Sequence, residues 1–185
     1  MKCIAITGPP GSGKSTLAKA LADELRKRGL KVCGISCPDV REGGRRVGFV
    51  VVDLETGERA WLAKVSGCPG PRVGRYFLCP EAEDLAVKAL SKDCDVYLID
   101  EIGPMELKLP RLREAMLKVL KSGKPFIAVH HLRLRDREFV EALKGCAKVY
   151  VTREAREEAW REAFDSLSRG SSPSRSSLSP PVRGY

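Results

Sequence analysis

The stretch GPPGSGKST, residues 8–16, limits the possible folds of this chain more than any other stretch. It has the spacing Gly-x-x-x-x-Gly-Lys-[Ser/Thr], between a strand-like apolar run at residues 4–6 and leucines at helical spacing over residues 14–28. Its glycines allow backbone angles in which successive N–H groups turn toward one anion, and the positive end of the following helix points at the same anion. This order predicts a phosphate-binding loop. A glycine-rich turn with an exposed lysine is the alternative that the flanking segments disfavour.

Within this loop we expect Lys14 to reach the β- and γ-phosphates of a nucleotide, and the hydroxyl of Ser15 to bind Mg²⁺. The loop residues expected to contact the nucleotide are Gly8, Pro9, Pro10, Gly11, Ser12, Gly13, Lys14, Ser15 and Thr16.

An acidic pair follows a second apolar run, in VYLIDEIGPMEL. A strand over residues 96–99 would deliver Asp100 and Glu101 to its carboxyl end, where ligands of parallel sheets bind. We expect Asp100 to hold Mg²⁺ through its water shell, and Glu101 to hold the attacking water. A pair that only ends the strand is the alternative. A kinase gains nothing from a group that activates water, so Glu101 favours a hydrolase.

The remaining patterns alternate between strand and helix, which predicts a parallel sheet covered by helices on both faces. Two β-prone segments, 47–54 and 58–63, flank a short turn and predict an inserted β-hairpin. Loop is expected over 65–74 and a short strand over 75–79. The later helices are expected at 81–91, 109–121, 136–144 and 153–167, the last capped by Thr152, and the later strands at 126–129 and 148–151.

The chain is expected to form one domain, residues 1–167, followed by a disordered tail, residues 168–185, rich in Ser, Pro and Arg. The tail is interpreted as passive, with modification or RNA contact as the alternative. No apolar run approaches the ~20 residues that cross a bilayer, so a cytoplasmic protein is expected. We also expect the protein to be a monomer. The net charge of +9 suits a nucleotide, a nucleic acid or a membrane surface; because the charges are mixed along the chain, a solvated surface is favoured and nucleic acid is not expected.

Seven cysteines occur without a CxxC pair, so a zinc site is not expected. Cys3 and Cys33 lie in strand-like runs and are interpreted as small buried apolar residues. The chain has no Asn and no Gln, a feature of proteins from very hot environments, where intracellular disulfides also occur. One internal disulfide is therefore possible, between cysteines that the sequence does not identify.

Basic side chains elsewhere are further candidates for phosphate contacts. Arg41, Arg45 and Arg46 surround Gly43 and Gly44 in REGGRRVG, and one of them could neutralise charge during phosphoryl transfer. Solvated charges at the base of the hairpin are the alternative. His130 and His131 follow a predicted strand, where they either contact phosphate or serve as polar packing.

Four stretches in this order, GPPGSGKSTL, VREGGRRVGFVVVDL, VGRYFL and DEIGPMEL, resemble one family, the small nucleoside-triphosphatases of thermophiles and animals. The resemblance covers residues 1–167. It implies a RecA-like α/β fold of the P-loop class with an added β-hairpin, and Mg²⁺-dependent hydrolysis of nucleoside triphosphates (ATP, GTP, CTP, UTP) to diphosphate and phosphate. It also implies that the nucleotide contacts Tyr97, Leu98, Ile99, Asp100, Glu101, Ile102, Gly103 and Pro104.

The prediction is therefore a nucleoside-triphosphate hydrolase with Lys14 and Glu101 as catalytic residues, and Ser15 and Asp100 as metal ligands. A nucleotide or small-metabolite kinase remains an alternative, because the same loop occurs there. A nucleotide-regulated RNA- or protein-binding module is a second one, supported by the basic balance of charge.

Overall fold

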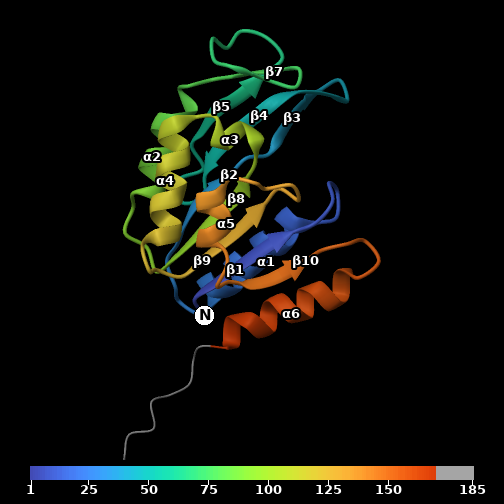
Figure 1. Cartoon of the computed structure of the whole chain (residues 1–185), viewed down its shortest axis with the longest axis vertical. Coiled ribbons are helices and arrows are strands. Elements are labelled where there is room, and N and C mark those ends of the chain that lie inside the picture. The colour runs from blue at the N-terminus through green and yellow to red at the C-terminus, as the bar shows by residue number, and fades with distance from the viewer. Residues whose placement is uncertain (170–185) are drawn as a thin grey trace, which may run out of the picture.

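The computed structural model describes residues 1–169, so nearly all of the predicted tail lies outside the described residues. Within them the chain forms ten strands and six helices (Figure 1). The strands are β1 (Cys3–Thr7), β2 (Val32–Ser36), β3 (Asp39–Glu42), β4 (Arg45–Asp53), β5 (Arg59–Lys64), β6 (Arg72–Val73), β7 (Tyr76–Leu78), β8 (Val96–Ile102), β9 (Phe126–His130) and β10 (Ala147–Tyr150). The helices are α1 (Lys14–Lys27), α2 (Ala82–Leu90), α3 (Pro104–Leu107), α4 (Pro110–Lys121), α5 (Arg137–Ala142) and α6 (Arg156–Ser168).

The strands join into one sheet with the order β10-β1-β9-β8-β2-β4-β5-β7-β6, and β3 pairs with β4 at its side. The first five strands of this order are parallel, as the alternation of strands and helices predicts. Their carboxyl ends therefore meet at one edge, where the phosphate loop follows β1 and the acidic pair ends β8. The predicted α/β fold is confirmed.

The rest of the sheet is antiparallel, and it has more strands than the one inserted β-hairpin that the sequence predicts. Only a few residues connect β2 to β3, β3 to β4, and β4 to β5, and such short connections allow antiparallel pairing but no crossover. The predicted hairpin is present as β4 and β5, and it extends the central sheet through β2. Gly43 and Gly44, with φ of +55° and +77°, form the turn of a further hairpin between β3 and β4.

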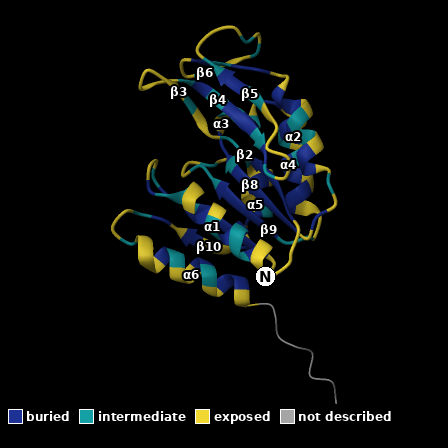
Figure 2. Cartoon of the chain, turned by 180° about the vertical axis from the view of Figure 1, so that it is seen from behind, coloured by how far each residue is buried: buried dark blue, intermediate teal, exposed yellow. Residues whose placement is uncertain are grey.

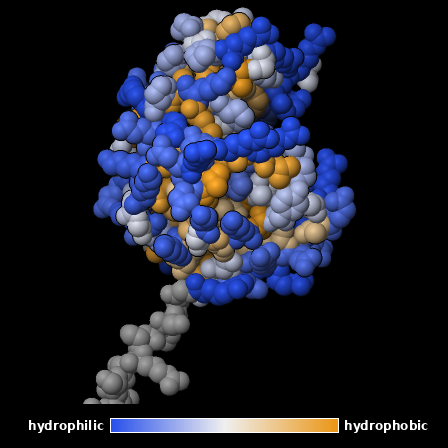
Figure 3. Space-filling view, viewed as in Figure 1, coloured by the Kyte–Doolittle hydropathy of each residue, from blue (hydrophilic) through white to orange (hydrophobic). Residues whose placement is uncertain are grey.

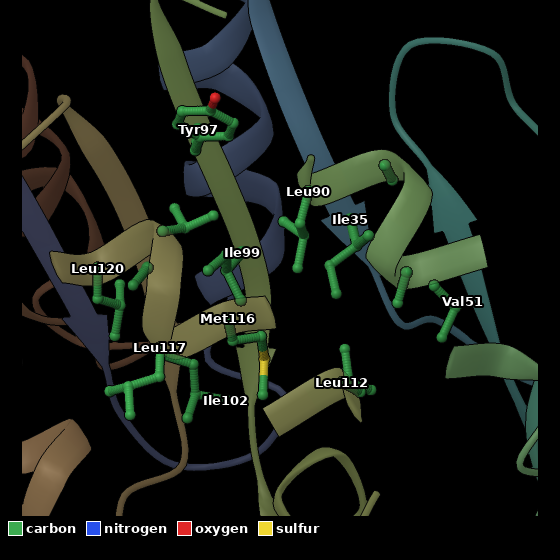
Figure 4. Close-up of a cluster of buried hydrophobic side chains, with 14 of the residues drawn as sticks. Ile35, Val51, Leu90, Tyr97, Ile99, Ile102, Leu112, Met116, Leu117 and Leu120 are labelled. Atoms are coloured by element: carbon green, nitrogen blue, oxygen red, sulfur yellow. The ribbon is translucent and has the colours of Figure 1, made fainter. Parts of the chain in front are cut away.

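Helices cover both faces of the parallel strands, with α1 and α6 on one face and α2 and α4 on the other (Figures 1 and 2). The two apolar layers follow from the alternation of side chains along each strand. On β1, Ile4 and Ile6 belong to the layer under α1 and α6, while Ala5 belongs to the other. On β8, Tyr97 and Ile99 point into the layer that Figure 4 shows, together with Met116 of α4. On the face of the molecule that Figure 3 shows, most side chains are hydrophilic, and apolar side chains form only small patches among them.

Several features differ from the sequence-based expectation. Strand β6, Arg72–Val73, lies within the stretch 65–74 that was expected to be loop. Strand β8 continues to Ile102, beyond the predicted end at residue 99, so the acidic pair is part of the strand. Helix α3 was not expected, and α6 begins at Arg156, after a turn in which Thr152 Oγ1 accepts a hydrogen bond from the N–H of Ala155 at 3.0 Å. None of the described helices is long and apolar enough to span a bilayer.

The cysteines form more disulfides than expected. Cys3 bonds to Cys146, Cys33 to Cys94 and Cys68 to Cys79, which leaves Cys37 with a free thiol. Cys3 and Cys33 are buried, as predicted, but their interpretation as unpaired apolar residues is wrong. The pairs are 143, 61 and 11 residues apart in sequence, and the fold rather than the spacing brings them together.

Candidate active site

The loop over residues 8–13 connects β1 to α1, and three glycines permit its shape. Gly8 has φ of +152°, and a Cβ there would lie 2.1 Å from the carbonyl oxygen of Val151 in the chain leaving β10. Gly11 and Gly13 have φ of +73° and +98°, in the left-handed region that favours glycine. Gly13 caps α1, so the helix begins at Lys14 with its N–H groups at the loop.

Lys14 lies against its own loop. Its Nζ donates hydrogen bonds to the carbonyl oxygens of Gly8 at 2.9 Å and Pro9 at 3.0 Å. The ammonium group therefore lies against the predicted phosphate-binding loop.

A cavity of about 340 Å³ brings the two predicted halves of the site together. Lys14 and Ser15 line it from α1, and Glu101 lines it from β8. The full lining is Gly8, Pro10, Gly11, Gly13, Lys14, Ser15, Thr16, Glu101, His131 and Leu132. Asp100 lines a second cavity of about 360 Å³, and Ser15 lines both, so the two predicted metal ligands share the wall of the second cavity.

Burial shifts the protonation of both acids. Asp100 is 9% exposed, and its burial raises its pKa to about 6. The Ser15 hydroxyl and the Lys14 ammonium oppose this shift, whereas the charge of Glu101 adds to it. Burial also raises the pKa of Glu101 above 4.5, against the attraction of Lys14. Ser15, Lys14 and Glu101 therefore all affect the protonation of Asp100.

Sequence reasoning gave no role to a third carboxyl beside this pair. Glu106 lies in α3, directly after the strand, and is 5% exposed. Burial raises its pKa to about 8, and the charges of Glu101 and Asp100 act in the same direction. The thiol of Cys37 interacts with this carboxyl, and the N–H of Cys37 donates to the carbonyl oxygen of Asp100 at 2.7 Å. The stretch DEIGPMEL contains Glu106, but its burial depends on α3, which the sequence did not indicate.

The predicted phosphate-contacting arginines lie on the β3–β4 hairpin. Asp39 pairs with Arg41 at 2.9 Å and with Arg46 at 3.0 Å, and neither arginine lines the cavity. Arg45 is exposed at the start of β4. The structure thus does not bring these arginines to the loop, and their part in catalysis stays a prediction.

The two histidines differ in position. His131 lines the cavity, whereas His130 lies at the end of β9, half-buried, with its Nδ1 3.1 Å from the carbonyl oxygen of His131. Burial lowers the pKa of His130 below 6.5. The neutral form of His130 is therefore favoured at neutral pH.

Most of the other residues predicted on β8 belong to the apolar layers. Tyr97, Ile99 and Ile102 are buried in one layer and Leu98 in the other, while Gly103 and Pro104 lead into α3. Their contact with nucleotide stays a prediction, as do the contacts predicted for the loop residues.

Two basic residues that the sequence reasoning passed over lie beside the loop. Arg153 and Arg156 follow β10 and reach Gly11 and Gly13, respectively. Their position follows from the pairing of β10 with β1, because the carboxyl ends of these parallel strands share one edge, and the sequence alone does not reveal this pairing.

Comparison with known proteins decides the family. The model of the family described as "NTPase" matches residues 3–164. The chain belongs to this NTPase family. The assignment confirms the resemblance and the predicted class of enzyme, a nucleoside-triphosphatase.

The chain is similar over nearly its whole length to members of this NTPase family. It is 70% identical over 168 residues to "Nucleoside-triphosphatase THEP1" of Ignicoccus hospitalis, covering 91% of this chain and 98% of the relative. The protein of the same name from Methanocaldococcus jannaschii is 38% identical over 172 residues, with 90% and 98% covered.

Two solved structures share the fold. The crystal structure of THEP1 from Aquifex aeolicus has a TM-score of 0.73 at 25% identity, over 88% of this chain and 97% of that one. A human cancer-related nucleoside triphosphatase has a TM-score of 0.73 at 30% identity, over 93% and 100%.

Proposed function

We propose that this protein hydrolyses nucleoside triphosphates to diphosphate and phosphate in the cavity between the loop and β8. The observation that carries the proposal is that Glu101 lines the same cavity as Lys14 and Ser15, although 86 residues separate Ser15 from Glu101 in the sequence. The names of the relatives support it, since each is called a nucleoside-triphosphatase.

Mg²⁺ is the proposed cofactor, and the donor set fits it. Ser15 and Asp100 offer a hydroxyl and a carboxylate oxygen that act on each other, and Mg²⁺ prefers oxygen ligands. When bound, the ion supplies positive charge at the phosphate oxygens. Because a nearby cation favours the ionised carboxylate, Asp100 would titrate well below 6 in the loaded enzyme.

The chain's own residues bind the phosphates and activate the attacking water. The N–H groups of the loop and of the first turn of α1 bind the phosphates, and Lys14 exchanges the carbonyl oxygens of Gly8 and Pro9 for phosphate oxygens. Glu101 accepts a hydrogen bond from the attacking water and takes its proton. A raised pKa makes Glu101 a stronger base than an exposed glutamate, which suits this role.

Replacement of Glu101 by Gln tests the assignment. Glu101→Gln keeps the size of the side chain but removes the proton acceptor, so phosphate release should fall by a factor of about 100 or more while nucleotide binding persists. Lys14→Ala should abolish turnover. Glu114→Gln, at an exposed position of α4, is the matched control and should retain wild-type turnover. Normal hydrolysis by Glu101→Gln would refute the role of this carboxylate.

We also propose broad use of ATP, GTP, CTP and UTP, because the cavity is lined by the loop that binds phosphates and no base-selective pocket is evident in the sequence. Phosphate release from the four triphosphates, with and without Mg²⁺ and at elevated temperature, measures this directly. A preference of more than about tenfold for one base would contradict it.

A second candidate is phosphoryl transfer to a small acceptor, and one observation favours it. The cavity of about 360 Å³ beside Asp100 is much larger than the ~30 Å³ that one water occupies, and Lys19 and Arg26 lie on its wall. Incubation with γ-labelled ATP and a set of nucleoside monophosphates distinguishes the kinase from the hydrolase. Label on an acceptor supports the kinase, and label in free phosphate supports the hydrolase.

A further inference from the structure

The segment that leaves β10 runs beside the phosphate loop that leaves β1. The two strands are parallel neighbours, with Thr7 opposite Tyr150, and the N–H of Val151 donates to the carbonyl oxygen of Thr7 at 2.8 Å. Residues that directly follow Val151 are therefore delivered to the loop by the sheet. Two arginines, Arg153 and Arg156, lie in this segment.

Both guanidinium groups lie close to the loop at its glycines, on the side of an open hollow next to α6 rather than in the lining of the 340 Å³ cavity. Arg153 Nε donates to the carbonyl oxygen of Gly11 at 3.4 Å, and a Cβ on Gly11 would lie 3.3 Å from Arg153 Nη2. A Cβ on Gly13 would lie 3.4–3.6 Å from Nη2, Nε and Cζ of Arg156. The bare glycine backbone thus lets two cationic groups approach the turn that binds phosphate.

Neither arginine is neutralised by an acid in the described part of the chain. No carboxylate of residues 1–169 lies within ion-pair distance of Arg153 or Arg156, although Glu154, Glu157 and Glu158 line the same open hollow as the two arginines. Some arginines of the protein are paired, as Arg113 is with Asp136 at 2.8 Å, whereas others at exposed positions, such as Arg161, have no ion pair within residues 1–169. Two unpaired guanidinium groups beside an anion-binding loop are available for an anionic ligand.

We propose that Arg153 and Arg156 are nucleotide-binding residues that donate charge-assisted hydrogen bonds to the phosphate chain. The inference rests on the proposed function for the identity of the ligand. Arginine suits this role because its planar group presents several N–H donors in a fixed geometry. The segment after β10 would then contact the phosphates on the side of α6, whereas Asp100 and Glu101 approach them from β8.

Direct binding measurements on four variants test the proposal. The variants are Arg153→Ala, Arg156→Ala, Arg156→Lys and Arg161→Ala. Arg161→Ala is the control of equal charge change, because Arg161 lies on the same open hollow but one helical turn further from the loop. Calorimetric titration at fixed ionic strength with Mg²⁺ uses two probes, ADP and inorganic tripolyphosphate. We expect each of the first two variants to weaken both probes by about tenfold, Arg156→Lys to recover part of the loss, and Arg161→Ala to change affinity less than about twofold.

Three outcomes would overturn the proposal. Wild-type affinity of Arg153→Ala and Arg156→Ala for both probes would remove the contacts. A loss confined to ADP would place the guanidinium groups on the base or ribose. An equal loss in Arg161→Ala would indicate a general effect of charge. A thermal unfolding midpoint close to that of the wild type shows that each variant has kept its fold.

The same titrations separate this inference from the proposed hydrolysis. A wild-type protein that binds ADP through these arginines but releases no phosphate from triphosphates would contradict the proposed function alone. A wild-type protein that hydrolyses triphosphates, with both alanine variants unaffected in binding, would contradict the arginine contacts alone.

Discussion

Three carboxyl groups meet at the end of β8, and their burial decides how many of them carry charge. The ammonium group of Lys14 favours the charged forms of Asp100 and Glu101, whereas for the buried Glu106 only its own backbone N–H and the thiol of Cys37 do so. A pKa of about 8 keeps Glu106 protonated at neutral pH. The site thus avoids a third negative charge in a region of low dielectric.

The protonation of Glu106 makes stability depend on pH. Because the folded-state pKa of about 8 lies above the ordinary value of 4.5, the unfolded chain releases its proton first as pH rises. The stability that the protonated carboxyl of Glu106 gives to the folded state is therefore fully present below pH 4.5 and is lost as pH rises to about 8. Glu106→Gln cannot lose a proton, so its stability relative to the wild type should increase by roughly 1–3 kcal/mol between pH 5 and pH 8.

Chemical denaturation of wild type and Glu106→Gln at pH 5 and pH 8 measures this difference. Glu114→Gln is the control, because it makes the same chemical change at an exposed position of α4. A stability difference between Glu106→Gln and wild type that does not change with pH would show that Glu106 is ionised throughout.

At the level of residues, sequence reasoning found Lys14, Ser15 and Glu101, and the structure brings these three to one cavity. It found them because the loop spacing and the position of a carboxylate after a strand are local patterns. Arg153 and Arg156 were missed because their signal is the neighbourhood of β1 and β10, which pairs segments more than 140 residues apart.

At the level of elements, the sequence predicts the longer ones well and the short ones poorly. α1, α2, α4 and the parallel strands have apolar positions at a clear period. β3, β6 and α3 have only four, two and four residues, which is too short for a period to show. Their conformation depends on what they pack against, as β3 depends on β4.

Helix α5 illustrates an element whose start the sequence does locate. Asp136 is its N-cap, and its side chain accepts from the N–H groups of Glu138 at 3.1 Å and Phe139 at 3.5 Å. Arg113 of α4 forms a two-pronged ion pair with the same carboxylate, with contacts of 2.8–3.0 Å. Asp136 thus caps α5 and connects it to α4 through the ion pair.

Removal of this carboxylate should destabilise the protein. Burial acts to raise the pKa of Asp136, but the hydrogen bonds from Arg113 and from Phe139 outweigh it and hold the pKa below 3.8. Asp136→Ala loses both cap and ion pair and should reduce the free energy of unfolding by about 1–3 kcal/mol, whereas Asp136→Asn keeps a cap acceptor and should lose less. Denaturant titration at pH 7 distinguishes these results, and equal stability of all three proteins would refute the role of the cap.

At the level of the whole molecule, disulfides connect parts that are far apart in sequence. Cys3–Cys146 joins β1 to the start of β10 and closes a loop of 143 residues, whereas Cys68–Cys79 closes one of 11 residues before α2. Neither pairing could be predicted, because the cysteine spacing does not encode which strands are neighbours. A long closed loop restricts the unfolded chain more than a short one.

This difference in loop length predicts a difference in stability between two variants. By chain entropy, removal of Cys3–Cys146 through a double alanine substitution should cost about 4–5 kcal/mol, and removal of Cys68–Cys79 about 2–3 kcal/mol. Denaturant titration without reductant compares them, and thiol titration in denaturant checks the bonds first. With seven cysteines and three bonds, the oxidised wild type should show one free thiol, that of Cys37. Seven free thiols before reduction, or a larger effect for the short loop, would contradict the proposed stabilisation, because only a bond that closes the long loop restricts nearly the whole unfolded chain.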